Sequence, residues 1–272
     1  MIPVLKDITF GQYFEGRSVI HRMDPRAKIL LLTVNIVFLF LTKNIFSLLV
    51  PAVQTLFVLI ISRVPAKMFL RNIKTILPII IFTTVINLFY GVGGTVLVTF
   101  WHFSISTAGI WRAIYMATRI ILLILISSVL TYTTTPNDIT DAIESLLSFL
   151  RVFGLKTAVH MLAMMMTIAL RFIPTLVEET EKIMSAQKAR GADLENGRLF
   201  ERIKALIPIL IPLLISSVRR AYELAEAMEC RCYNGGVGRV RMKKLKYTLL
   251  DLLAAAINTL FCVGVILLNI YI

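Results

Sequence analysis

The sequence lacks the residue patterns on which most enzyme active sites are built. It contains no phosphate-binding Walker loop, no H-E-x-x-H zinc helix and no G-x-S-x-G nucleophile elbow. Its three histidines, His21, His102 and His160, lie in three separate regions of the chain. We therefore expect a protein that is not an enzyme and that carries no cofactor.

Cysteine is also scarce. The three present, Cys230, Cys232 and Cys262, are an odd number without the spacing of a disulfide framework. The Cys230-x-Cys232 pair beside Met228 has the soft sulfur atoms that thiophilic metals prefer, but no histidine accompanies it. We expect reduced thiols and no metal site. The first sixteen residues lack the regions of a cleaved signal peptide, so we expect the mature chain to begin at Met1.

Acidic residues are few compared with basic ones. There are 16 Asp and Glu against 29 Lys and Arg, which gives a formal net charge of +13. A soluble protein with this excess would suggest nucleic-acid binding, but 57% of the residues are hydrophobic and the mean hydropathy is +0.81. Membrane proteins concentrate Lys and Arg in their cytoplasmic loops, which accounts for the same charge. The composition therefore indicates an integral protein of the cell membrane, with no nucleic acid as partner.

The apolar residues form runs that approach the roughly 20 residues a helix needs to cross a bilayer. We predict five transmembrane helices, at about residues 26–42, 45–62, 76–90, 112–132 and 247–272. The basic clusters that flank them predict a cytoplasmic N-terminus and an external C-terminus. The expected fold class is an all-α integral membrane protein with a cytoplasmic domain of amphipathic helices. Its predicted regions are a four-span membrane domain (1–132), a cytoplasmic-side region (133–246) and a C-terminal transmembrane helix (247–272).

Two helix starts are predicted from local side-chain chemistry. Asp24-Pro25 provides an N-cap followed by a proline at the first helical position. Thr135-Pro136, with Asp138 at the third position, is a variant of the capping box. The helix after Pro136 is amphipathic and is expected to lie along the membrane face or under a neighbouring helix.

Two other prolines are expected to interrupt helices. Pro65 begins a short amphipathic piece that ends before the third span, and Pro174 breaks or kinks a Met-rich apolar segment at 159–172. The charged helix at 175–190 and a long helix at about 199–233 follow.

Four residues are candidates for contacts inside the membrane or with a partner. Arg119 lies inside the fourth span, where an unpaired charge costs about 2.5–3.5 kcal/mol. It should face protein or water, and the alternative is that it extends to the outer headgroups. Met161 and Met164 either fill an ordinary core or line an adaptable partner groove. Ile143 lies on the apolar stripe of the amphipathic helix.

One small pattern occurs twice in the region from Pro174 to Gly236. Arg190 follows Ala189 and precedes Gly191, and Arg231 precedes Cys232, so each arginine has small neighbours where a helix should end. A cation at a helix C-terminus can simply answer the helix dipole, worth about 0.3–1 kcal/mol. The repetition favours a second interpretation, in which small residues let another surface approach while the arginine projects into it.

The sequence resembles the transmembrane T components of energy-coupling factor (ECF) transporters, which import vitamins and metal ions. No single matching stretch is specific, but their order along most of the chain is. The stretches are His21-Arg22-Met23-Asp24-Pro25-Arg26-Ala27-Lys28, Thr134-Thr135-Pro136, Leu170-Arg171-Phe172-Ile173-Pro174, Ala186-Gln187-Lys188-Ala189-Arg190-Gly191 and Ala227-Met228-Glu229-Cys230-Arg231-Cys232-Tyr233. One departure is Cys232, where this family often has Gly or Ser.

The resemblance implies a mechanism of coupling. Two long cytoplasmic coupling helices would each end in an arginine motif and dock into one of two ABC-type ATPases. Arg190 and Arg231 would each bind a carboxylate, Ala189, Gly191 and Cys232 would permit close approach, and Tyr233 would close the second motif. The ATPases would bind and hydrolyse ATP, and the helices would pass their motion to a small substrate-binding membrane subunit. That subunit would pack on the Met-rich segment and on the amphipathic helices.

Other functions fit the sequence less well. An ion-driven secondary transporter should carry acidic residues within its spans, and the one acid near a span is Asp251, at the edge of the last. A lipid-modifying enzyme would find only His102 and Ser104 in the uncharged outer loop. Within the resembling family, a T component dedicated to cobalt or nickel uptake remains an alternative to one shared among several vitamin-binding subunits.

Overall fold

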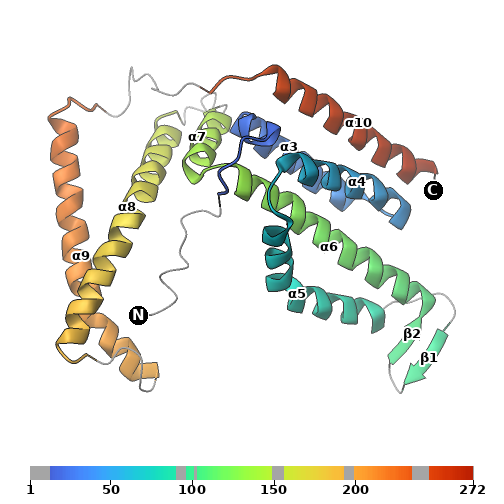
Figure 1. The fold of residues 1–272 in the computed structure, drawn as a ribbon, viewed down its shortest axis with the longest axis horizontal. Coiled ribbons are helices and arrows are strands. Elements are labelled where there is room, and N and C mark those ends of the chain that lie inside the picture. Colours follow the sequence, from blue (N-terminus) through green and yellow to red (C-terminus); the bar gives the residue numbers. More distant parts are fainter. Residues whose placement is uncertain are drawn as a thin grey trace. The chain divides into compact units, whose positions relative to one another are not determined.

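The computed structural model describes residues 13–89, 96–100, 103–148, 156–192, 199–234 and 245–271. These residues fall into two compact units, each considered by itself. The described residues of the bundle unit lie within Gly11–Ala142 and Lys244–Ile272, and those of the hairpin unit lie within Ile143–Lys243. Helices dominate both, which confirms the predicted all-α membrane fold (Figure 1).

The bundle unit contains most of the helices and one small β-hairpin. Its elements are α2 (Val19–Arg22), α3 (Pro25–Leu41), α4 (Ile45–Ser62), α5 (Ala66–Phe89), β1 (Val96–Phe100), β2 (Phe103–Ser106), α6 (Thr107–Thr133) and α10 (Leu249–Tyr271). The antiparallel pair of β1 and β2 lies within the predicted outer loop. The hairpin unit contains α8 (Lys156–Ala189) and α9 (Leu199–Glu229). Helix α7 (Pro136–Leu147) contains the boundary between the two units.

Six of the described helices are long and apolar enough to cross a membrane, namely α4, α5, α6, α8, α9 and α10. Four of the five predicted spans correspond to α4, the second part of α5, α6 and α10. The first corresponds to α3, which has 17 residues. The count differs because α8 and α9 each contain a sufficiently apolar window despite the charged residues elsewhere in them.

Two internal prolines do not end helices. The predicted amphipathic piece after Pro65 and the third span form one helix, α5, with Pro78 inside it. The Met-rich segment and the charged helix after it likewise form one helix, α8, with Pro174 inside it. An internal proline removes one backbone hydrogen bond and bends a helix, and neighbouring turns can sustain its path. Figure 1 shows the bend in α5.

Both predicted helix starts are confirmed. The side chain of Asp24 accepts a hydrogen bond from the backbone N–H of Arg26, with Pro25 as the first helical residue of α3. At α7, the hydroxyl of Thr135 accepts from the backbone N–H of Asp138 at 3.2 Å and donates to its carboxylate at 2.8 Å. Both caps use neighbours in sequence, which is why a local pattern could predict them.

Three side-chain contacts align α10 with α3 and α4. The carboxylate of Asp251 accepts the backbone N–H of Asp24 at 2.9 Å, near the start of both α3 and α10. Midway, the amide of Gln54 donates to Asn258 at 2.6 Å. At the far end, Asn269 donates to the carbonyl of Leu41 at 3.0 Å. Helices α3 and α10 therefore run parallel, as their predicted orientation requires.

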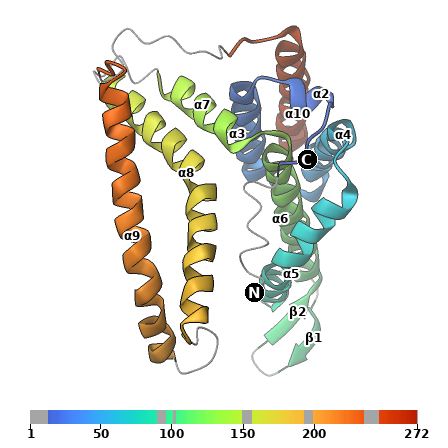
Figure 2. The same ribbon diagram turned by 60° about the vertical axis from the view of Figure 1, so that its left-hand side comes forward.

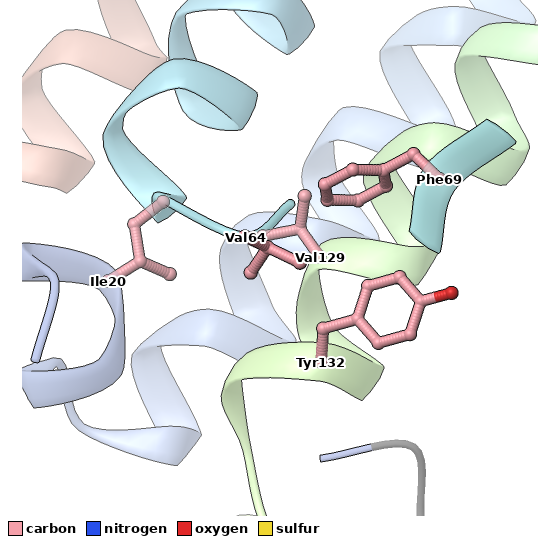
Figure 3. Close-up of a cluster of buried hydrophobic side chains, with 5 residues drawn as sticks. All are labelled: Ile20, Val64, Phe69, Val129 and Tyr132. Atoms are coloured by element: carbon pink, nitrogen blue, oxygen red, sulfur yellow. The ribbon is translucent and has the colours of Figure 1, made fainter. Parts of the chain in front are cut away.

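The packing core of this unit lies where α2, α4, α5 and α6 meet. Its buried residues are Ile20, Val64, Phe69, Val129 and Tyr132 (Figure 3). The rings of Phe69 and Tyr132 pack edge to face, with centroids 5.2 Å apart and planes at 81°. The Tyr132 hydroxyl donates to the carbonyl of Met68 at 3.2 Å, so the buried phenol is satisfied.

Helices α8 and α9 form an antiparallel pair (Figure 2). Near the C-terminal end of α8, Gln187 donates to the carbonyl of Pro208, in the first part of α9. Further back along α8, Glu179 pairs with Arg220 at 3.0 Å. Tyr233, beyond the end of α9, donates to the sulfur of Met164 at 2.8 Å. The C-terminal ends of α8 and α9 thus lie at opposite ends of the pair.

Candidate functional site

The two predicted arginine motifs end their helices in the same backbone geometry. After α8, the N–H of Ala192 donates to the carbonyl of Gln187, and the N–H of Gly191 donates to that of Lys188, both at 3.0 Å. After α9, Tyr233 and Cys232 donate to Met228 and Glu229, at 3.0 and 2.8 Å. Both are Schellman motifs.

The shared motif places Arg190 and Arg231 at the same position, directly before the residue that reverses the chain. Both side chains are exposed, as are Ala189, Gly191 and Cys232, while Tyr233 is half-buried. A guanidinium held here can reach outward as a planar fork that binds a carboxylate through two hydrogen bonds. The structure therefore presents the six predicted coupling residues as two equivalent tips.

The residue after each arginine has a conformational reason to be small. Gly191 has a φ of +86° and Cys232 a φ of +53°, both in the left-handed region. That region costs a non-glycine residue about 1–2 kcal/mol. Glycine thus suits the first tip, while the cysteine at the second tip retains some strain. The sequence predicted a helix end through positive φ at Gly191, and for Cys232 it suggested only that a small residue permits close approach.

The two tips are widely separated. Because α8 and α9 are antiparallel and Gln187 contacts Pro208, most of α9 separates Arg190 from Arg231. The 23 residues from Pro208 to Arg231 correspond to about 35 Å along a helix that rises roughly 1.5 Å per residue. One binding groove on one partner cannot enclose both arginines.

Polar contacts join the two helices between these tips. The carboxylate of Glu179 accepts hydrogen bonds from Ser216 and pairs with Arg220. Beside this cluster lies a groove of about 500 Å³, which the apolar side chains Ile168, Phe172 and Leu224 help to line. A fixed polar bridge of this kind sets the register of α8 against α9.

The Met-rich part of α8 presents an exposed apolar face. Met161 and Met165 are 48% and 57% exposed, and Met164 is partly covered by its contact with Tyr233. In α9, Leu210 and Leu214 are 58% and 66% exposed. Surfaces this apolar require lipid or another protein. Met161 and Met165 are therefore not buried in a core of the described chain, whereas Met164 is half-buried.

Arg119 and Ile143 are the two other candidate contact residues. The guanidinium of Arg119 lies 4.6 Å above the ring of Phe40, so it faces an aromatic side chain of α3. Ile143 is half-buried in α7.

A polar cluster at the start of α3 was missed by the sequence analysis. Asp24, Arg26, Lys28 and Asp251 gather there, and Asp24 and Arg26 form an ion pair at 2.9 Å. Burial alone would raise the pKa of Asp24, but the hydrogen bonds and charge of Arg26 outweigh burial and lower it. The sequence signal was the Asp-Pro-Arg stretch, which we interpreted as a helix start and as part of a family motif, without a contact to Asp251.

Comparisons with known proteins place these motifs in context. The profile of a family described as "Cobalt transport protein" (CbiQ) matches residues 16–243, which include both tips. The energy-coupling factor transporter transmembrane protein EcfT of Ruminiclostridium cellulolyticum is 49% identical over 266 residues, covering 98% of each chain. The chain belongs to this family. The EcfT protein of Thermosediminibacter oceani is 47% identical, over 97% of this chain and 98% of its own length. That of Bacillus subtilis is 41% identical, over 90% of this chain and 92% of its own length.

As a member of the EcfT family, the protein is a multi-pass membrane component of a transporter. This confirms the resemblance on which the sequence analysis relied. Within the described residues, no group of three or more His, Cys, Asp or Glu side chains could hold a metal ion. The arrangement that stands out chemically is the pair of arginine tips.

Proposed function

We propose that this protein couples two cytoplasmic ATPase subunits to a substrate-binding subunit in the membrane. The two arginine tips are the docking points, one for each ATPase. ATP is bound and hydrolysed by those partners, and the protein itself is a non-catalytic subunit. The motion of the ATPases enters through the tips and passes along α8 and α9.

The observation that carries this proposal is the equivalence of the tips. Arg190 and Arg231 occupy the same position of the same motif, and both are exposed. Their separation of about 35 Å along α9 calls for two docking sites. Two copies of one ATPase, or two related ATPases, supply two similar grooves at such a distance.

The chemistry of each docking site follows from the exposed residues. Each guanidinium binds a carboxylate inside a groove, and the small residues beside it allow the groove walls to close around the helix end. Arginine suits this contact because its flat fork makes two parallel hydrogen bonds, which lysine cannot reproduce.

The exposed apolar face of α8 is our proposed contact for the substrate-binding subunit. Met161 and Met164 adapt their shape to a partner because their side chains are unbranched and polarisable. Ile143 of α7 and the first part of α5 are further candidate contacts. A crosslinker attached at Met161 or Ile143 should reach a membrane protein of the complex, and a failure to do so would count against this surface.

The cargo is proposed to be a vitamin or another micronutrient, because the relatives are named for energy-coupling factor transporters. The family description favours the alternative of a component dedicated to cobalt or nickel. Membrane-protein purification separates the two proposals. A shared component should bring several small membrane proteins with it, and a dedicated one should bring a single membrane partner.

The proposed orientation places the N-terminus and the hairpin unit on the cytoplasmic side of the cell membrane. In the bundle unit, the basic residues Arg63, Lys67 and Arg71 lie between the end of α4 and the first turns of α5. The turn between α3 and α4, at the opposite end of α4, contains one basic residue, Lys43. This asymmetry supports the orientation through the positive-inside rule.

The decisive experiment replaces both tip arginines. Arg190→Ala combined with Arg231→Ala should abolish co-purification of the ATPases and uptake, while membrane insertion is retained. Removing one partner of a buried charge pair typically costs about 2–5 kcal/mol. Uptake is measured with whichever of a panel of radiolabelled B vitamins, Co²⁺ and Ni²⁺ the wild-type complex imports.

Matched controls are available on the same helices. Arg171→Ala in α8 and Arg219→Ala in α9 remove exposed arginines from interior positions. Both should retain ATPase binding and uptake. Normal uptake in the double tip variant would remove the proposed docking role.

A further inference from the structure

Over the part of the chain that begins at residue 13, two connections join the bundle unit to the hairpin unit, one after α6 and one before α10. The chain leaves the bundle unit through α7, directly after α6, and returns at Lys244, shortly before α10. The side chain of Lys28 in the first turn of α3 contacts the end of α6. The backbone N–H of the N-cap residue Asp24 contacts the start of α10, and the side chain of Arg26 contacts Tyr247 just before it. All of these contacts lie within the bundle unit.

Lys28 holds the outgoing connection. Its ammonium donates to the carbonyl of Thr133 at 2.9 Å and to the hydroxyl of Thr134 at 3.2 Å. Thr133 is the last residue of α6, and Thr134 is its C-cap. Lys28 is only 7% exposed, so its ammonium group is buried against the C-terminal end of α6.

Asp24 and Arg26 hold the returning connection. Asp251, in the first turn of α10, accepts the backbone N–H of Asp24 with one carboxylate oxygen. Its other oxygen accepts the backbone N–H and the hydroxyl of Thr248, at 2.7 and 2.9 Å. The guanidinium of Arg26 pairs with Asp24 and lies 4.3 Å above the ring of Tyr247.

Packing alone does not explain a buried ammonium at this position. Lys28 borders a largely apolar cavity of about 300 Å³, and apolar side chains surround most of it. Buried ions are expensive to desolvate, and well-packed apolar residues often stabilise a protein as well or better. What the ammonium supplies is a directional attachment to two specific oxygens of the α6 to α7 junction.

We propose that the first turn of α3 is the joint that transmits motion between the hairpin unit and the transmembrane helices, with Asp24 and Lys28 as its positioning residues. The inference rests on the proposed coupling function. Because both connections are fastened to one rigid turn, a displacement of α8 and α9 moves α3, α6 and α10 together. With the attachment loosened, the hairpin unit moves without carrying these helices.

The test separates transport from ATP hydrolysis in the complete complex. Lys28→Met keeps the length of the side chain and removes its hydrogen bonds. Thr134→Val removes one acceptor at nearly constant shape, and Thr134→Ser retains it. Complexes purified with their ATPases are reconstituted into liposomes, and uptake of the identified cargo and phosphate release are measured on the same sample.

If the first turn of α3 is this joint, removing the contacts of Lys28 should uncouple ATP hydrolysis from uptake. The ATPases still co-purify and hydrolyse ATP in Lys28→Met, while uptake per ATP falls about fivefold or more, the lower end of typical coupling energies. Thr134→Val shows a smaller loss, and Thr134→Ser behaves like the wild type. Gln54→Leu, which removes a buried hydrogen bond between α4 and α10 away from both connections, keeps the normal ratio.

Two results would contradict the proposal that the first turn of α3 is a joint. One is an unchanged ratio of uptake to hydrolysis in Lys28→Met and Thr134→Val. The other is the same ratio loss in Gln54→Leu, which would indicate a general effect of buried polar contacts. If Lys28→Met fails to insert, the two Thr134 variants decide the question. Failure of the proposed function itself is recognised separately, because wild-type protein would then bind no ATPase.

Discussion

Substituting the small residue that follows each tip arginine tests the backbone geometry of the two tips directly. A Cβ built on Gly191 meets no heavy atom of the described chain within 4 Å, so Gly191→Ala introduces no clash. Its cost is the left-handed backbone at φ +86°, about 1–2 kcal/mol. Alanine also restricts the unfolded chain, which returns about 0.4–1 kcal/mol. The net loss should be roughly 1 kcal/mol.

The opposite kind of substitution, from a residue with a side chain to glycine, should stabilise the second tip. Cys232→Gly relieves about 1–2 kcal/mol of left-handed strain at φ +53° and loses about 0.5–1 kcal/mol to the entropy of glycine. The two variants therefore differ in sign, although each changes one exposed residue at the same position of the same motif.

Hydrogen exchange measures this difference at the affected bonds. The amides of Ala192 and Tyr233 close the two motifs, and a change of about 1 kcal/mol corresponds to a roughly fivefold change in local opening. We expect faster exchange at Ala192 in Gly191→Ala and slower exchange at Tyr233 in Cys232→Gly. Unchanged exchange at Ala192, or faster exchange at Tyr233, would refute the assignment of equivalent motifs.

Two further variants test the internal supports. The pKa of Asp24 is lowered from 3.8, so its charge stabilises the folded state above about pH 4. That contribution is lost as the pH falls through the lowered pKa. Asp24→Asn should therefore lower the thermal stability at pH 5–8 and make the stability depend less on pH under acid conditions. Glu179→Gln should lower the free energy of unfolding by about 0.2–1 kcal/mol, a small loss because its ion-pair partner Arg220 is 38% exposed. An unaltered denaturation midpoint in low salt would show that the pair contributes nothing to stability.

Local chemistry made part of this structure predictable. The starts of α3 and α7 followed from Asp24-Pro25 and Thr135-Pro136, because capping uses neighbours within one turn. The end of α8 followed from Gly191 after Arg190. The second helix was expected to continue to about Tyr233, but α9 ends at Glu229 and the chain turns at Cys232, because cysteine carries no preference for positive φ that would have marked this end.

Tertiary packing decided the features that the sequence did not predict. The sequence separated the piece after Pro65 from the third span and left Pro174 as either a break or a kink, yet α5 and α8 are each one continuous helix. The contact of Asp24 with Asp251 joins residues 227 positions apart, and no local pattern pairs them. The burial of Lys28 was likewise hidden, because a lysine among other basic residues resembles an ordinary cytoplasmic flank.

The central claim is that the arginine tips are the surfaces buried against the ATPases, and native cysteines can test it. Cys230 and Cys232 flank Arg231 and are exposed, while Cys262 is buried and can be replaced by alanine. Maleimide labelling of this variant is followed in the purified protein alone and in the complex with its ATPases. Docking predicts that the complex slows labelling and that Arg231→Ala restores the free rate. Equal labelling rates with and without bound ATPases would contradict the account.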